Sequence, residues 1–211
     1  AKAKAEAEAA ATFEAVTALL RARADPGLAD DEGTTPLHWP ARRNDVEVME
    51  LLLNAHASPN AVDRCGRTPL HYAAIKGPGD DDKGVHLALW LLLDEGADLT
   101  QHDGEGYLPV TLATQGGHVA SLKVLLEDKA DPNCRNTDAD RSTCLSWAAY
   151  VGNAEAVRLL LQWDADVNAV VGSKTALDDA RVGSMEQTYR GNLAAVEEAL
   201  RAAGAKRVDE L

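Results

Sequence analysis

The feature that most constrains this chain is the stretch at residues 63–74, D-R-C-G-R-T-P-L-H-Y-A-A, because imperfect copies of it recur along the sequence. Residues 30–38 match its first part at an offset of 33 residues and end in the same T-P-L-H. Gly66 is a turn former, Thr68 can cap a helix, and Pro69 suits the first helical position. Each copy therefore predicts a turn that leads directly into a helix.

A second apolar helix is predicted after each copy, for example at residues 46–53 and 89–93, and a turn of the type at 96–100, G-A-D-L-T, follows it. A 33-residue period with T-P-L-H, a leucine-rich second helix and such a turn resembles the ankyrin repeat family. The resemblance implies an all-α solenoid of about six stacked helix-turn-helix units with short β-turn or hairpin tips, whose first and last units are capping repeats.

We expect one domain over residues 1–211. Its units are predicted at approximately 1–29, 30–62, 63–102, 103–135, 136–170 and 171–211. Residues 1–11, rich in Ala, Lys and Glu, predict a helix that covers the end of the stack. Two departures from the period, at 78–84 and 183–190, predict insertions in surface loops, which either have no function or contact a partner.

Three turns carry an unusual residue where the family usually has glycine. These residues are His56, Lys129 and Asp164, each at the turn after a second helix. If the left-handed geometry is kept there, each non-glycine residue carries strain of about 1 kcal/mol.

Bulk composition narrows the function classes. A net charge of −13 and a pI near 4.8 argue against general nucleic-acid binding, which needs a basic face. No apolar run reaches the length of about 18 residues that a membrane span needs, so no direct membrane insertion is expected. The three cysteines form no C-x-x-C pair, which favours thiols in a reducing compartment. We expect an intracellular soluble protein, cytoplasmic or nuclear, with an organelle interior as an open alternative.

Catalytic motifs are absent from the sequence. No glycine-rich phosphate loop, H-E-x-x-H zinc motif or G-x-S-x-G elbow occurs. We therefore predict no enzymatic activity, no cofactor and no metal. The resemblance gives His38 and His71 a structural role, because the family's imidazole at this position hydrogen-bonds the backbone of a neighbouring unit.

Partners in this family bind the concave surface formed by the tips and first helices, so the resemblance implies a protein partner here. The candidate partner-binding residues are Trp39, Arg42, Arg43, Arg64, Arg67, Tyr72, Lys76, Glu105, Tyr107, Trp147 and Tyr150. The cations in the N-terminal half suggest a basic pocket for an acidic segment, with arginine forks supplying directed contacts. Alternatively, these cations pair locally with Asp31, Glu32 and Asp63.

The leading interpretation is a non-catalytic protein–protein interaction module, a monomer or one subunit of a hetero-complex. One alternative is a structural subunit held permanently in a larger assembly. Another is an ankyrin segment of a longer enzyme or channel, which the start at Ala1 rather than Met leaves open. A monomer on size exclusion favours the module, whereas obligate co-purification favours the subunit.

Overall fold

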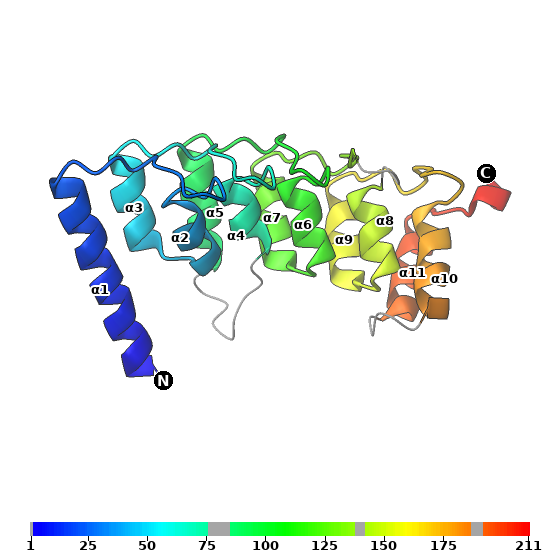
Figure 1. Ribbon diagram of the computed structural model, residues 1–211. Coiled ribbons are helices and arrows are strands. Elements are labelled where there is room, and N and C mark those ends of the chain that lie inside the picture. Colours follow the sequence, from blue (N-terminus) through cyan, green and yellow to red (C-terminus); the bar gives the residue numbers. More distant parts are fainter. Residues whose placement is uncertain (1, 76–84, 138–141, 187–191) are drawn as a thin grey trace.

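The computed structural model describes residues 2–75, 85–137, 142–186 and 192–211 (Figure 1). Within these ranges the chain is helical, with no strands and two isolated antiparallel bridges. The α-helices are α1 (Lys2–Arg21), α2 (His38–Arg43), α3 (Val46–Asn54), α4 (Pro69–Ile75), α5 (Val85–Asp94), α6 (Pro109–Gln115), α7 (Val119–Glu127), α8 (Cys144–Tyr150), α9 (Ala154–Gln162), α10 (Ala176–Glu186) and α11 (Leu193–Ala202), followed by the 3-10 helix η1 (Val208–Glu210). The predicted all-α class is confirmed.

The helices form two layers that run along one axis (Figure 1). The inner layer consists of α2, α4, α6, α8 and α10, each in contact with the next, and the outer layer consists of α1, α3, α5, α7, α9 and α11. The turns that precede the inner helices line one edge of the stack as tips. This is the predicted solenoid, whereas the limits of its six units stay a prediction.

Small and aliphatic side chains fill the space between the layers. Leu70, Leu89 and Leu122 are fully buried, while Ala74 and Ala148 lie on inner helices with no exposed surface. Alanines at the helix contacts let neighbouring helices approach closely, so each unit adds a thin layer to one continuous core.

Two buried histidines join each of their units to the next tip. The Nδ1 atom of His38 accepts the backbone N–H of Thr35 at 3.0 Å, so its Nε2 carries the proton and donates to the carbonyl of Arg67 at 3.1 Å. His71 repeats this bridge to the carbonyl of Tyr107 at 3.2 Å, and burial lowers the pKa of His71. The predicted structural role of both histidines is confirmed.

Asparagines make a second set of bridges between the turns that follow the outer helices. The side chain of Asn60 donates to the carbonyl of Gly96 at 3.0 Å and accepts the N–H of Asp98 at 2.7 Å. Asn133 and Asn168 hold the later turns in the same way. Each asparagine thereby satisfies a backbone donor and acceptor of the following unit.

Helix α2 begins later than the other inner helices because of Pro40. Proline has no N–H, so the bond from residue 40 back to the carbonyl of Pro36 is missing. The helix therefore starts at His38 rather than at Pro36, which puts Pro40 in its first turn, where proline is tolerated. By contrast, α4 starts at its own proline, Pro69.

The two predicted insertions fall mostly where the structure gives no description. Residues 78–84 lie outside the described residues, as do residues 187–190 of the second insertion. The remaining residues of that insertion, 183–186, extend α10. 

The three turns predicted to be strained do adopt left-handed backbone geometry. Their φ angles are 68° at His56, 71° at Lys129 and 60° at Asp164. In the corresponding turn after α5, Gly96 has φ of 81°, and nothing lies within 4 Å of where its Cβ would be. The strain at these three residues therefore follows from their positive φ, which glycine adopts without a Cβ clash.

Replacing Lys129 by glycine should raise the free energy of unfolding by about 1 kcal/mol, because glycine adopts positive φ without a Cβ clash. Chemical denaturation measures the change. Asp128→Gly is a matched control, since residue 128 has φ of −87° and gains nothing from glycine. A lower stability for Lys129→Gly than for the wild type would contradict the prediction.

Candidate functional site

The tips at residues 63–67 and 103–107 are each held by an aspartate that points back into its own turn. The Oδ1 atom of Asp63 accepts the N–H groups of Cys65 and Arg67, and Asp103 does the same for Glu105 and Tyr107. Both aspartates are buried, so these hydrogen bonds replace the lost hydration of the carboxylates. The tips therefore present their other side chains from a fixed backbone.

The Oδ2 atoms of these two aspartates accept hydrogen bonds from residues that the sequence analysis predicted to bind a partner. Arg67 donates from Nε to Oδ2 of Asp103 at 3.0 Å, and its guanidinium also lies 3.7 Å from Glu105. The hydroxyl of Tyr72 donates to Oδ2 of Asp63 at 2.7 Å; burial and this bond raise the pKa of Tyr72 to about 12. Arg67 and Tyr72 thus help to hold the stack itself.

The other basic candidates lie on the surface. Arg64 is 3.4 Å from Glu32, an exposed pair of the kind that adds little stability. Arg42 and Arg43 are exposed at the end of α2, and the guanidinium of Arg42 lies 5.6 Å from the centre of the Trp39 ring. Lys76 lies outside the described residues.

Aromatic candidates gather in two places along the inner layer. Trp39, which is 48% exposed, lies 6.2 Å from Tyr72 between ring centres. Trp147 and Tyr150 lie together on α8 with an edge-to-face contact of 5.8 Å. The structure brings residues together within each pair, while the helix α6 separates one pair from the other.

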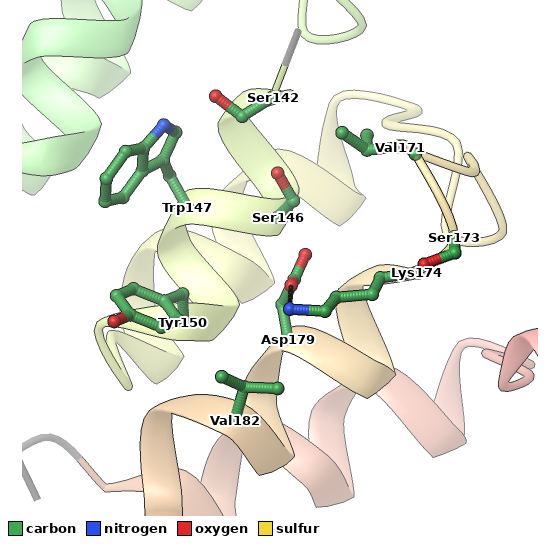
Figure 2. Close-up of a pocket in the computed structure, with 10 residues that line it drawn as sticks. Ser142, Ser146, Trp147, Tyr150, Val171, Ser173, Lys174, Asp179 and Val182 are labelled. Atoms are coloured by element: carbon green, nitrogen blue, oxygen red, sulfur yellow. Dashed lines mark ion pairs between the residues drawn. The ribbon is translucent and has the colours of Figure 1, made fainter. Parts of the chain in front are cut away.

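A pocket of about 510 Å³ opens between α8 and α10. Figure 2 shows Trp147 and Tyr150 projecting from α8 on one side, and Val182 from α10 on the other. Lys174 closes a third side from the turn before α10, with its Nζ 3.9 Å from a carboxylate oxygen of Asp179. The lining residues are Ser142, Ser146, Trp147, Tyr150, Val171, Gly172, Ser173, Lys174, Asp179 and Val182.

This pocket lies where the histidine bridge is missing. Ser146 occupies the position of His38 and His71 in its unit, and Lys174 precedes the next inner helix as Arg67 and Tyr107 precede theirs. The hydroxyl of Ser146 is 2.9 Å from the carbonyl of Thr143 and caps its own helix, so it does not reach the next tip. A serine therefore leaves open a space that an imidazole fills elsewhere in the stack.

Sequence reasoning identified Trp147 and Tyr150 but missed the other side of the pocket. Val171, Lys174 and Asp179 come from the following unit, whose first helix lacks the proline and histidine of the T-P-L-H motif. The sequence feature that could have indicated the pocket was the short side chain of Ser146 at the position of His38 and His71.

Among the residues that the structure describes, no cluster of His, Cys, Asp and Glu could hold a metal ion. No helix in the same part of the chain is long and apolar enough to cross a membrane.

Comparison with known proteins decides the family. A family model described as ankyrin repeats in three copies matches residues 6–82 and 81–171. The chain belongs to the ankyrin repeat family. Ankyrin repeats are generic protein–protein interaction modules, and domains built from them are generally non-catalytic.

Individual relatives match a shorter part of this ankyrin stack. Inversin from dog is 34% identical over 85 residues, which is 40% of this chain and 8% of inversin. Human inversin is 33% identical over 85 residues, with the same coverage of each chain. The ankyrin repeat and KH domain-containing protein mask from Drosophila melanogaster is 35% identical over 85 residues, 40% of this chain and 2% of that protein. The chain thus spans less than a tenth of the curated relatives it matches.

Replacing Asp103 by alanine should lower the free energy of unfolding by about 3 kcal/mol, because Arg67 and two tip N–H groups lose a buried acceptor. Urea denaturation measures the loss. Glu105→Gln is the control: its side chain is 70% exposed, so removing its charge should cost less than about 0.5 kcal/mol. Equal losses for the two variants would contradict a structural role of the Arg67–Asp103 pair.

Replacing Ser146 by histidine should make the ankyrin stack more stable by about 1 kcal/mol, since the imidazole can keep the cap on Thr143 and donate to the carbonyl of Lys174. The free energy of unfolding is measured by denaturation. Ser146→Ala, which loses the capping hydroxyl and leaves the pocket open, should be less stable than the wild type. A histidine variant no more stable than the alanine variant would show that the missing bridge does not explain the pocket.

Proposed function

We propose that this ankyrin protein binds an extended segment of a partner protein along its inner face, the predicted concave groove formed by the tips and the inner helices. The observation that carries the proposal is the placement of exposed aromatic and basic side chains on a frame of buried hydrogen bonds. Aromatic residues and arginines are the types most enriched in binding hot spots. A rigid backbone lowers the ordering cost of binding.

The side chains on the N-terminal part of the inner face suit the binding of an acidic segment. Arg42 and Arg43 project from the end of α2 beside the exposed ring of Trp39. Guanidinium groups form directed, charge-assisted hydrogen bonds with carboxylates. The proposed acidic contact depends on Arg42 more than on Arg64 and Arg67, which already face Glu32 and Asp103.

The pocket beside α8 is suited to bind one apolar side chain of the partner, which would anchor the segment there. Trp147, Tyr150 and Val182 give it apolar walls, while Ser142 and Lys174 add polar groups at its rim. An apolar side chain of the segment would be buried there, and burial of such a group contributes about 1.5 to 3 kcal/mol. We propose that the same segment spans both ends of the face.

The test is selection of binding peptides from a random displayed library on the full chain, followed by affinity measurement in solution. Enriched peptides should combine acidic residues with an apolar anchor. The double variant Arg42→Glu, Arg43→Glu should weaken their binding at least about tenfold, because repulsion replaces attraction at two sites. Ser146→His should weaken binding of the same peptides by filling the anchor pocket.

A matched control makes the same charge change on the outer layer. The double variant Lys123→Glu, Arg158→Glu alters two exposed cations on α7 and α9 and should leave the affinity within about twofold. Equal weakening by both double variants would mean that net charge, rather than the inner face, governs binding and would contradict the proposal.

The second candidate, a subunit of a permanent assembly, is favoured by apolar residues on the outer layer. Leu87 and Trp90 on α5 are 53% and 38% exposed, and Trp163 at the end of α9 is 37% exposed. Exposed apolar surface of this kind can mark a contact with another chain. Size exclusion with light scattering distinguishes the two: a stable monomer supports the interaction module, and self-association through the outer layer supports the subunit.

A further inference from the structure

Two of the three cysteines face one another at the base of one tip. The sulfur atoms of Cys134 and Cys144 are 3.3 Å apart, although the residues are ten positions apart in the chain. Both side chains are buried, with 8% and 0% of their surface exposed. The third cysteine, Cys65, is exposed on a different tip.

The backbone sets these two cysteines opposite each other. Arg135 and Thr143 form an isolated antiparallel bridge, and Cys134 and Cys144 are the next residues outward on its two sides. Directly opposed residues of antiparallel segments have Cα atoms about 4.5 to 5.5 Å apart. This lies inside the range of about 4.4 to 6.8 Å that a disulfide requires.

We propose that Cys134 and Cys144 form a disulfide when the protein is oxidised by a peroxide. The proposal does not depend on how the inner face binds a partner. It assigns different chemistry to the cysteines: a reversible cross-link for this pair and an open thiol at Cys65.

The reaction balances with hydrogen peroxide as the oxidant. One thiolate attacks a peroxide oxygen, which gives a sulfenic acid and, after proton uptake, one water. The other sulfur then attacks the sulfenic sulfur, forms the S–S bond and releases the second water. Two thiols lose two electrons and two hydrogens in all, and the peroxide is reduced to two waters.

Hydrogen bonds link the two cysteines to each other and to a threonine. The hydrogen bond between the two sulfurs raises the pKa of Cys134 and lowers that of Cys144. Thr111 also contacts Cys144, with its hydroxyl oxygen 4.0 Å from the sulfur.

A disulfide would link the residues that flank the bridge between Arg135 and Thr143. The cross-link restricts the unfolded chain and so stabilises the folded protein. Ser142, which lines the pocket beside α8, lies two residues before Cys144 in the chain. Oxidation therefore acts on a tip that borders the inner face.

The test oxidises the full chain with graded hydrogen peroxide, denatures it, alkylates free thiols with N-ethylmaleimide and determines the intact mass. The reduced chain should take up three labels, one for each cysteine. The oxidised chain should lose the mass of two hydrogens and take up one label, on Cys65, with a cross-linked peptide that contains Cys134 and Cys144. Added dithiothreitol should restore three labels and lower the thermal midpoint relative to the oxidised chain.

Variants of each cysteine complete the test. Cys65→Ser should still lose two labels on oxidation, whereas Cys134→Ser and Cys144→Ser should each stop the intramolecular bond. Because the wild-type peptide map needs no variant, a misfolded serine variant would not affect the result. Three labels after peroxide treatment, disulfide-linked dimers through Cys65, or sulfinic acid at either buried cysteine in place of the bond would overturn the proposal.

Discussion

The stack depends on a hydrogen bond that leaves one unit and ends on the backbone of the next. A single pair of short helices cannot bury its apolar face alone, so stability comes from the interface between neighbouring units. At two interfaces a histidine spans that interface, with Nδ1 tied to its own threonine and Nε2 donating to the carbonyl of Arg67 or Tyr107. At these two interfaces the bond fixes the distance and angle between neighbouring units, and thereby the spacing of the side chains that they present on the inner face.

The later units keep the hydrogen bond that caps the start of the inner helix, but they change the hydrogen bond to the next unit. Thr143 is still capped by the side chain three residues ahead, Ser146, and Thr175 by Asp178. The long reach to the next tip is replaced by other groups: Thr111 donates to Asn136, and Thr175 itself donates to the carbonyl of Lys206. Only short-range capping is preserved at Ser146, and the pocket opens there. The local helix start and the coupling between units are thus separable properties of one motif.

Much of this architecture could be predicted from the sequence, because T-P-L-H and the 33-residue period each encode a local structure. The left-handed turns at Lys129 and its counterparts were predictable for the same reason. The role of Arg67 was not, since its partner Asp103 lies 36 positions away in another tip, and a sequence motif carries no information about that distance. Similarly, the pocket combines α8 with the turn before α10, so it exists only in the assembled stack.

The same coupling limits which residues can evolve toward a partner. Asp63, Asp103, Arg67 and Tyr72 have polar atoms engaged by neighbouring tips or helices, so changing them alters the frame as well as the surface. Trp39 and Arg42 contact one another at the end of the short helix α2, where substitution leaves the bridges between units intact. At the opposite end, the pocket walls can change without breaking a histidine bridge, because Ser146 occupies the histidine position there. The two ends of the inner face therefore differ in chemistry, one cationic and aromatic and the other a hollow, and an extended partner would have a preferred direction along it.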